Sequence, residues 1–496
     1  MIAPAPAPGR DVAFQLPRRL AGMTDSNTNR RDPFSEEFKK FIVSDWAPYS
    51  SELPARLPAA DYAARRRKQI SELHPGATLV FPAGPLKVRA NDTDYRFRPH
   101  TAFAYFTGLG EDREPDAVLV VHEGEGVLFF RPRAPRTDRE FYANARYGEM
   151  WVGQRDSLEE MQSAVGIECR DIRTLEEYLT GRENLFVIRE SDPAVTALVD
   201  TVRGDESDDD ALLMQHSSSL RFVKDEYEVG EMGRAIAATK VGFDAVVREL
   251  PNAVANGRGE RWVEGIFALH ARHLGNAVGY DTISASGDHA NTLHWIRNDG
   301  DLREDELLLL DAGVEVNSLY TADITRTLPI GGKFTKAQRH VYDAVHRAQQ
   351  AGIDAARAGE PFKNVHAAAV KVVAEFVEEL GMLPVSAEES LAEEGGHHRR
   401  WMVHGTSHHL GLDVHDCAHA LREEYREGDL KAGMIITVEP GIYFKSTDLL
   451  VPEEYRGIGV RIEDDILVTD GDAVVLSDAF PRSADDVEAW IADLQA

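Results

Sequence analysis

Cysteine is nearly absent from this sequence, since Cys169 and Cys417 are the only two among 496 residues. So few thiols exclude a disulfide framework and a cysteine-rich zinc site, and they fit a reducing compartment. No apolar run approaches the length of a membrane span. The segment Met1-Ile-Ala-Pro-Ala-Pro-Ala-Pro8 also lacks the basic leader and long apolar core of a signal peptide. These absences predict a cytoplasmic protein.

Basic residues are outnumbered, with 55 Lys and Arg against 84 Asp and Glu and a net charge of −29. Such an acidic chain is a poor partner for nucleic acid or for an anionic membrane. Several enzyme signatures are missing as well: there is no His-Glu-x-x-His, no Gly-x-Ser-x-Gly and no Walker loop. The sequence therefore carries none of these three catalytic motifs.

The length of 496 residues exceeds what one hydrophobic core usually serves, so we expect two domains with additional segments. Residues 1–55 mix Pro, Ala, Ser, Asn and charge, which predicts a partly disordered extension with a short helix at 35–42. Residues 56–223 are expected to form a smaller α/β domain. Its predicted strands are 77–81, 117–122, 127–131 and 185–188, with a hairpin around 123–126, and its predicted helices are 60–72, 157–163 and 174–180.

Residues 224–496 show one order of elements twice, in which two helices are followed by acidic strands. Apolar residues at helical spacing run from Val229 to Leu250, and we expect Pro251 to end that helix. Further helices are predicted at 260–274, 335–358 and 364–380, with Thr335 and Gly381 as caps. The order suggests two similar halves that face each other across a site.

Two aspartates stand in strand-like runs of the first half. If the hairpin that joins the runs is centred on Asn317, Asp311 and Asp323 lie directly opposite each other. Facing carboxylates destabilise a ladder unless a cation lies between them. The alternative is that one of the two is a surface residue at the end of a turn.

Two glutamates occupy similar positions in the second half. Alternation over residues 461–467 places Glu463 on one face with Arg461 and Asp465. Alternation over residues 435–439 places Glu439 on the same face as Thr437. The alternative is the solvated face of an antiparallel sheet, which shows the same alternation.

Histidines concentrate in the stretch Val403-His-Gly-Thr-Ser-His-His-Leu-Gly-Leu-Asp-Val-His-Asp416. A strand-like path would put His404 and His408 on one face and His409 on the other, with His415 further along. A buried carboxylate is costly unless it is paired or bound to a cation. Four carboxylates at core-like positions and a histidine cluster therefore indicate a metal site, whereas the neighbouring Cys417 is expected to be a packed, inert thiol.

Five blocks of the sequence together resemble the aminopeptidase P/prolidase branch of the methionine-aminopeptidase-like metallopeptidases. They are Asp311-Ala-Gly, Ala322-Asp-Ile-Thr-Arg-Thr327, His404-Gly-x-x-His408 with Leu412-Asp-Val-His-Asp416, Thr437-Val-Glu-Pro-Gly441, and Gly457-Ile-Gly-Val-Arg-Ile-Glu-Asp-Asp465. The first domain resembles the aminopeptidase P N-terminal domain in Tyr105-Phe-Thr-Gly-Leu109, Pro115-Asp-Ala-Val-Leu119 and Glu149-Met-Trp-Val-Gly153. The likeness covers roughly residues 56–480.

The resemblance implies an α/β pita-bread domain with pseudo-twofold halves at residues 224–496, preceded by the smaller α/β domain. It also implies two divalent ions per subunit, usually Mn²⁺. The implied metal ligands are Asp311, Asp323, His408, Glu439 and Glu463, of which Asp323 and Glu463 bridge the ions. The donor set agrees, because carboxylates and one imidazole suit Mn²⁺ better than they suit a thiolate zinc site.

The family mechanism would then follow. A metal-bridging hydroxide attacks the scissile carbonyl carbon, and Glu439 moves the proton toward the leaving proline nitrogen. His415 resembles the histidine that stabilises the tetrahedral intermediate. The remaining implied site residues are His404 and His294 in the substrate pocket, Tyr443 and Arg461 beside the ligands, and Trp151, which resembles an aromatic supplied by a neighbouring subunit. For Trp151 the alternative is a core tryptophan of its own domain.

The sequence thus predicts an aminopeptidase that releases the residue before a penultimate proline and that assembles as a homodimer or homotetramer. Prolidase, which cuts only dipeptides, shares the five blocks and is the closest rival, although the first-domain motifs favour the aminopeptidase. A metal-free binding or scaffold protein of the same fold is a more distant rival, because such a protein would be expected to have lost metal ligands. All five are present here.

Overall fold

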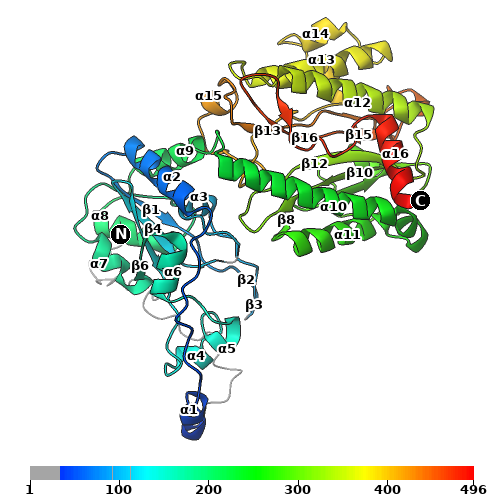
Figure 1. Ribbon diagram of the computed structural model, residues 1–496. Coiled ribbons are helices and arrows are strands. Elements are labelled where there is room, and N and C mark those ends of the chain that lie inside the picture. The colour runs from blue at the N-terminus through cyan, green and yellow to red at the C-terminus, as the bar shows by residue number, and fades with distance from the viewer. Residues whose placement is uncertain (1–33, 92, 112) are drawn as a thin grey trace, which may run out of the picture.

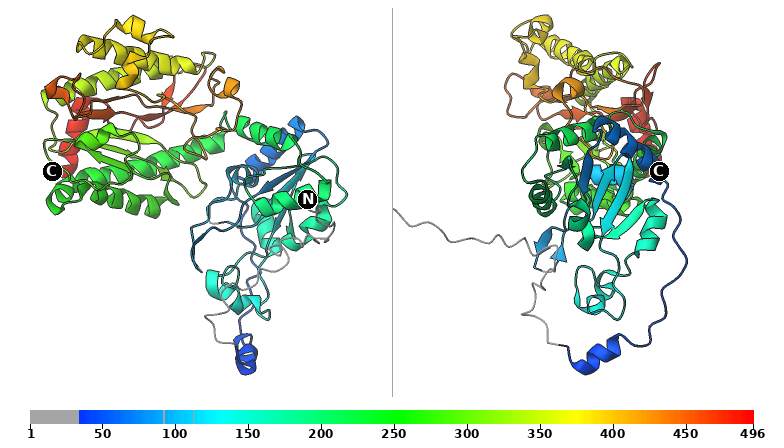
Figure 2. Two further views of the ribbon diagram at one scale, coloured as in Figure 1. Left: turned by 180° about the vertical axis from the view of Figure 1, so that it is seen from behind. Right: turned by 90° about the vertical axis from the view of Figure 1, so that its left-hand side faces the viewer.

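The computed structural model describes residues 34–91, 93–111 and 113–496. It forms two α/β bodies that meet around residues 219–225 (Figure 1), and the view from behind in Figure 2 shows the same division. The part of the predicted extension at residues 1–33, with the disorder expected there, lies outside the described residues. Within the described residues, no helix has both the length and the apolar character needed to cross a membrane.

The first body is built on a five-stranded mixed sheet in the order β6-β5-β4-β1-β7. Its strands are β1 (Thr78–Pro82), β4 (Val118–His122), β5 (Glu125–Phe130), β6 (Glu168–Asp171) and β7 (Leu185–Val187). Every residue of β1 is buried because helices cover both faces of the sheet. Leu79 and Phe81 pack on the side of α3 (Thr101–Thr107), whereas Val80 packs on the side of α7 (Leu175–Leu179) and α8 (Pro193–Arg203). The predicted strands and the hairpin at residues 123–126 are confirmed.

The other predicted helices of this body are also confirmed, with ends that shift by one or two residues. Helix α2 is Ala60–Leu73, and α6 is Leu158–Val165, which begins with a capping box at Ser157. Helix α9 (Asp209–Ser219) leads into the junction with the second body.

A small arm projects from the first body (Figure 1). It contains α4 (Glu140–Ala143), α5 (Glu149–Val152) and the predicted short helix, α1 (Glu36–Ile42), capped by Ser35, while the first body also carries the small ladder of β2 (Val88–Ala90) and β3 (Thr93–Asp94). Phe38 packs edge-on against Tyr142 with ring centroids 5.8 Å apart, and the Tyr49 hydroxyl donates to Glu149 at 2.7 Å. Residues 34–49 are therefore folded against α4 and α5.

The second body has two halves of similar construction, as predicted. One half pairs α10 (Glu226–Asn256) and α11 (Gly259–Leu274) with a sheet in the order β12-β10-β9, and the other pairs α12 (Lys336–Ala355) and α13 (Lys363–Glu379) with a sheet in the order β13-β16-β17. The strands are β9 (Ile283–Ser286), β10 (Leu307–Ala312), β12 (Ile324–Pro329), β13 (Ile435–Val438), β16 (Asp464–Leu467) and β17 (Val474–Val475). The helix pairs form the outer layers and the strands lie between them (Figure 1).

Shorter elements complete the second body. They are β8 (Ala277–Val278), β11 (Val314–Glu315), β14 (Gly441–Tyr443), β15 (Gly459–Arg461), α14 (Ala387–Leu391), α15 (Arg422–Tyr425) and α16 (Ala484–Gln495). Strand β14 pairs with β15, and β8 pairs with β11.

The prediction that Pro251 ends a helix is wrong, because α10 continues through it to Asn256. Proline has no N–H to donate to the carbonyl four residues earlier, which here belongs to Val247. The Nε2 amide of Gln495 in α16 donates to that carbonyl at 2.9 Å. A residue from the other end of the chain therefore satisfies the carbonyl that the proline leaves free, and the helix tolerates the proline.

Candidate active site

The register predicted for the two aspartates is wrong by two residues. Strands β10 and β12 pair Asp311 with Thr325, not with Asp323. The turn is centred on Ser318 instead of Asn317, since Val316 N donates to Tyr320 O at 3.0 Å. A shift of two residues keeps the same side chains on the same face of the sheet. Asp311 and Asp323 therefore still converge, as diagonal neighbours, and the Tyr280 hydroxyl lies within hydrogen-bond distance of both carboxylates, at 2.7 and 2.5 Å.

The strand predicted at residues 461–467 is interrupted where Glu463 lies. Strand β15 ends at Arg461 and β16 begins at Asp464. The N–H of Glu463 donates to Thr325 O in β12 at 3.1 Å, while the N–H of Glu439, just after β13, donates to Thr406 O at 2.9 Å. Both glutamates thus leave their own ladder, and these bonds join the two halves and the histidine stretch at one place.

His408 is oriented by bonds on both sides of its ring. Its Nδ1 lies 3.1 Å from His409 O and must donate to that carbonyl, which leaves the Nε2 lone pair free to bind a cation. Nε2 points toward Asp323 Oδ2 at 3.3 Å and Glu439 Oε1 at 3.7 Å. The histidine stretch does not form the regular strand that was predicted, because only His409 makes a bridge, with Ile436.

Three of the predicted ligands form one compact group. Asp323, His408 and Glu463 each offer a ligand atom, and these atoms all lie within 4.8 Å of one another. Asp311 adjoins the group through Tyr280, and Glu439 adjoins it through His408. All four carboxylate side chains are largely removed from water, so this donor set suits a hard divalent cation.

The local charges show why a cation would be accommodated here. Burial, together with the neighbouring carboxylates Asp323, Glu439 and Asp311, raises the pKa of Glu463 well above its ordinary value. Burial also raises the pKa of Glu439 to about 7, although His408 and Arg461 oppose that effect. Burial alone would lower the pKa of His408, but the bond to Asp323 and the charge of Glu439 raise it to about 9, so a bound cation would displace the Nε2 proton. If all four were ionised, these carboxylates would carry more negative charge than Arg461 and His408 neutralise, and a bound cation would offset that excess.

Arg461, Tyr443 and His404 form a chain of contacts beside this group. Arg461 Nη2 donates to Asp311 Oδ2 at 2.5 Å, and its Nη1 donates to the Tyr443 hydroxyl at 3.1 Å. His404 Nε2 lies 2.8 Å from the same hydroxyl. The guanidinium therefore fixes one carboxylate and one aromatic side chain at once.

His415 and His409 occupy opposite environments. The His415 ring packs edge-on against His408 with centroids 4.5 Å apart, at the wall of the cavity. His409 is buried between Phe222, Phe362 and Tyr425, with ring centroids 4.5, 4.8 and 4.8 Å away. Of the two, only His415 can reach a molecule in the cavity.

The group of ligands opens into a cavity of about 500 Å³ whose wall also includes His294, Leu293, Ile296 and Val414. His294 lies on the loop at residues 287–300, which is held by the buried carboxylate of Glu260. This carboxylate accepts four bonds, from Ser286 N, His289 Nδ1, Trp295 Nε1 and Gly300 N, at 2.6–2.9 Å. The segment begins with a short 3-10 helix (Gly287–Asn291), and these bonds give it a defined shape beside the cavity.

Trp151 does not line the cavity of its own chain. It lies in α5 on the arm, its side chain is half-exposed, and its Nε1 donates to Tyr142 O at 2.8 Å. The alternative reading as a fully buried core residue of the first domain is therefore wrong, whereas the predicted contribution to a neighbouring subunit stays a prediction.

Sequence reasoning missed residues that orient the predicted ones. Tyr280 joins the two aspartates and belongs to no motif that we identified. Thr325 donates to Glu463 Oε2 at 2.7 Å, and Thr437 Oγ1 accepts from His408 N at 3.2 Å. A signal existed for both threonines, since each stands two residues from a predicted ligand and so shares its face of the strand.

Comparison with known families gives two matches. Residues 230–470 match the model of metallopeptidase family M24, and residues 62–185 match the aminopeptidase P N-terminal domain. Together these two segments cover both bodies of the structure.

Individual proteins resemble the chain over nearly its whole length. Xaa-Pro aminopeptidase 2 of Streptomyces coelicolor is 47% identical over 465 residues, which are 92% of this chain and 96% of that protein. The structure of aminopeptidase P from Escherichia coli with the inhibitor Pro-Leu has 28% identity and a TM-score of 0.77, covering 88% of this chain and 98% of the other. Zn-substituted E. coli aminopeptidase P in complex with product aligns with a TM-score of 0.75 and 28% identity, over 88% and 99% of the two chains.

Proposed function

The chain belongs to metallopeptidase family M24, and on that premise we propose that it is an Xaa-Pro aminopeptidase. It releases the N-terminal residue of peptides whose second residue is proline. The catalytic domain has the pita-bread fold, and it follows an aminopeptidase P N-terminal domain. The observation that carries the proposal is the convergence of Asp323, His408 and Glu463 in a cavity-lining group on that fold.

The bond that this enzyme cuts needs a specialised site. The proline nitrogen has no N–H when it is part of a peptide bond, and its ring constrains the chain on both sides. Peptidases that require an extended substrate with a donating N–H therefore handle such bonds poorly. A cavity with polar groups on one wall and the apolar side chains of Leu293, Ile296 and Val414 on another suits a short, partly apolar peptide end.

We assign the metal ligands as Asp311, Asp323, His408, Glu439 and Glu463. Membership of the family implies divalent ions, and we propose two per subunit, with Mn²⁺ as the native ion because the donor set is rich in oxygen. Bound there, the ions would supply Lewis-acid activation of a water and of the scissile carbonyl. The excess negative charge of the carboxylates supports this assignment.

The side chains around the ligands then have separate tasks. Glu439 is the proposed proton carrier, because its carboxylate stands between the ligand group and His404, whose Nδ1 lies 3.8 Å from Glu439 Oε2. His415 would donate to the oxyanion that develops at the scissile carbonyl. The proposed substrate-contacting residues are His294, His404, Tyr443 and Arg461, with Trp151 supplied in trans. Arg461 also fixes the Asp311 carboxylate, because its Nη2 donates to Asp311 Oδ2.

Rates on two peptide lengths test the substrate class against prolidase. With added Mn²⁺, we expect an Xaa-Pro-Xaa tripeptide to be cleaved at least about tenfold faster than the matching Xaa-Pro dipeptide, as judged by kcat/KM. A strong preference for the dipeptide would instead identify a prolidase. Failure to cleave either peptide with metal bound would favour the scaffold protein of the same fold.

We further propose that the enzyme is a cytoplasmic homodimer or homotetramer with domains at residues 1–55, 56–223 and 224–496. Two buried thiols without a partner cysteine fit a reducing compartment.

The support for assembly is an apolar row on one short helix of the arm. Its three large side chains, Met150, Trp151 and Val152, are about half-exposed. Exposed apolar clusters of this kind mark interaction sites.

Mixing two inactive variants tests whether Trp151 acts in trans. One parent is Asp323→Asn and the other is Trp151→Ala, and the two are combined under conditions in which subunits exchange. Mixed oligomers would contain some sites with intact ligands and an intact tryptophan, so we expect activity to return in part. Trp262→Ala, a partly exposed tryptophan on α11, is the control and should leave activity unchanged. A fully active monomer in sedimentation, or no rescue despite confirmed exchange, would contradict the arrangement.

A further inference from the structure

The loop that carries His415, residues 411–417, has neither helix nor strand. Nothing in the described part of the protein makes a hydrogen bond to the His415 ring, whose packing partner is His408. The position of the ring therefore depends on how firmly the backbone of this loop is held. Catalysis is sensitive to such placement, because a displacement of about 1 Å can cost roughly a hundredfold in rate.

The residue next to His415 anchors the loop from inside the protein. Asp416 is buried, and its Oδ1 accepts from Arg221 Nε at 2.9 Å while its Oδ2 accepts from Lys224 Nζ at 3.3 Å. Burial would raise the pKa of Asp416, but the charges of Arg221 and Lys224 outweigh burial and hold it below its usual range. The carboxylate is thus a fixed anion at the base of the loop.

The start of the same loop is packed tightly against this anchor. A Cβ atom added to Gly411 would lie 2.4 Å from Asp416 Oδ2 and 2.9 Å from the Lys224 Cε. The N–H of Asp416 donates to His409 O at 2.9 Å, which ties the loop to the metal-ligand segment. Little room remains for the loop to shift while Lys224 stays in place.

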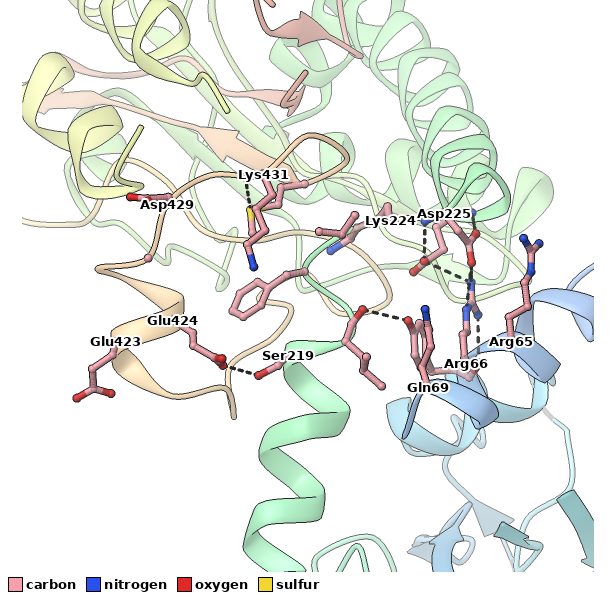
Figure 3. Close-up of a pocket in the computed structure, with 17 residues that line it drawn as sticks. Arg65, Arg66, Gln69, Ser219, Lys224, Asp225, Glu423, Glu424, Asp429 and Lys431 are labelled. Carbon is pink, nitrogen blue, oxygen red and sulfur yellow. Dashed lines mark hydrogen bonds and ion pairs between the residues drawn. The ribbon is translucent and has the colours of Figure 1, made fainter. Parts of the chain in front are cut away.

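Arg221 and Lys224 belong to the junction between the two bodies, not to the catalytic sheet. The Tyr105 hydroxyl of the first body donates to Leu220 O at 3.1 Å, and Arg66 of α2 pairs with Asp225 at 2.8 Å. Figure 3 shows Arg66 reaching across the junction to Asp225, beside Lys224. A second cavity of about 570 Å³ lies at this junction, and its lining includes Arg66, Lys224 and Asp225.

The first body also holds the outer side of the loop. Arg98 Nη2 donates to Leu412 O at 2.7 Å, and the Thr101 hydroxyl donates to Asp413 Oδ1 at 2.7 Å. Arg98 is itself fixed by Glu315 at 2.7 Å. The first body therefore holds one side of the His415 loop directly, through Arg98 and Thr101. The junction residues hold the other side through Asp416.

We propose that Arg221 and Lys224, acting through Asp416, are positioning residues for His415, so that the junction between the domains sets the rate of peptide cleavage. The inference rests on the proposed function, in which His415 assists the transition state. It assigns the first domain a catalytic contribution in addition to any part in assembly. Removing Lys224 should act on kcat more than on KM, because the substrate itself does not touch it.

A double-mutant cycle provides the test. Lys224→Met keeps the length of the side chain and leaves Asp416 neutralised by Arg221, so no buried charge is stranded. In the wild-type background we expect kcat on an Xaa-Pro-Xaa peptide to fall by roughly tenfold, with KM within about twofold. In the His415→Ala background the same substitution should change kcat by less than about twofold, because the histidine that it positions is gone. A full tenfold loss in both backgrounds would overturn the proposal.

Lys431→Met is the matched control, since Lys431 lines the same junction cavity but is exposed and does not contact the loop. It should leave kcat unchanged. Hydrogen exchange of the purified, metal-loaded protein without substrate tests how firmly the His415 loop is held, separately from the reaction. Peptides spanning residues 410–418 should exchange at least roughly threefold faster in Lys224→Met than in Lys431→Met. Unchanged exchange would refute the proposal that Lys224 and Asp416 hold the His415 loop, whatever the activity. A wild-type protein that cleaves no Xaa-Pro peptide would refute the proposed function alone.

Discussion

Replacing Asp323 with asparagine is expected to abolish peptide cleavage while the fold is retained. Asp323 stands at the centre of the site, with its Oδ2 3.3 Å from His408 Nε2 and its Oδ1 bonded to Tyr280. Of the five proposed ligands, it is one of the three whose ligand atoms all lie within 4.8 Å of one another. An amide keeps the shape but cannot offer two anionic oxygens, so the variant should bind fewer than two ions per chain.

The expected loss is large because metal activation contributes several kcal/mol to the barrier, and each 1.36 kcal/mol corresponds to a factor of ten in rate. We therefore expect kcat/KM to fall by roughly a thousandfold or more. The fold should survive, since removing one of several crowded buried carboxylates relieves repulsion. Circular dichroism and thermal melting would verify this, and elemental analysis would count the bound ions.

Asp281→Asn is the matched control, because Asp281 lines the same cavity but is exposed and has no proposed ligand role. It should keep its two ions and remain within a few-fold of wild-type activity. An Asp323→Asn enzyme that stays fully active in a chelator would remove the basis of the metal assignment.

Local patterns in the sequence predicted which side chains share a face. Alternation along a strand is a property of the backbone itself, so Glu439 could be placed with Thr437 without knowledge of the partner strands. The same rule kept Asp311 and Asp323 together although the turn between them was placed one residue too early. Errors that preserve the period of two do not disturb a site of this kind.

Long-range contacts account for what could not be predicted. Helix α10 passes through Pro251 because Gln495 bonds the carbonyl of Val247 from the far end of the chain. The strand breaks at Glu463 because its N–H finds Thr325 in the other half. Tyr280 contacts the carboxylates of Asp311 and Asp323, which lie 31 and 43 positions further along the chain, outside any local motif. Each of these depends on which segments meet in space, and that information is absent from a local pattern.

The contacts of Asp416 show that local sequence patterns also fail to reveal residues that matter for function through long-range contacts. Asp416 was part of a recognised block, but its partners, Arg221 and Lys224, lie nearly two hundred positions earlier, at about the point where the domains join. A sequence block that resembles a family motif indicates where the chemistry takes place. The contacts that hold the block still are supplied from elsewhere in the chain, and only the folded structure identifies them.

Two histidine variants should separate catalysis from stability within this one short stretch. His415→Ala is expected to lower kcat by about a hundredfold or more, which is the usual scale for losing one donor to the oxyanion. KM and metal content should change little, because His415 is not among the proposed ligands. His409→Ala should leave kcat near the wild-type value, since His409 lies among Phe222, Phe362 and Tyr425 and faces away from the cavity.

His409→Ala should instead reduce stability, because it leaves a cavity in an aromatic cluster, and truncating a large buried side chain costs about 2 kcal/mol or more. Denaturant unfolding of both variants, alongside steady-state kinetics and metal analysis, would measure the two effects independently. The expected result is a crossed pattern, in which His415→Ala is stable but slow and His409→Ala is fast but less stable. Equal losses of kcat in the two variants would mean that the catalytic face of the histidine stretch has been assigned to the wrong residue.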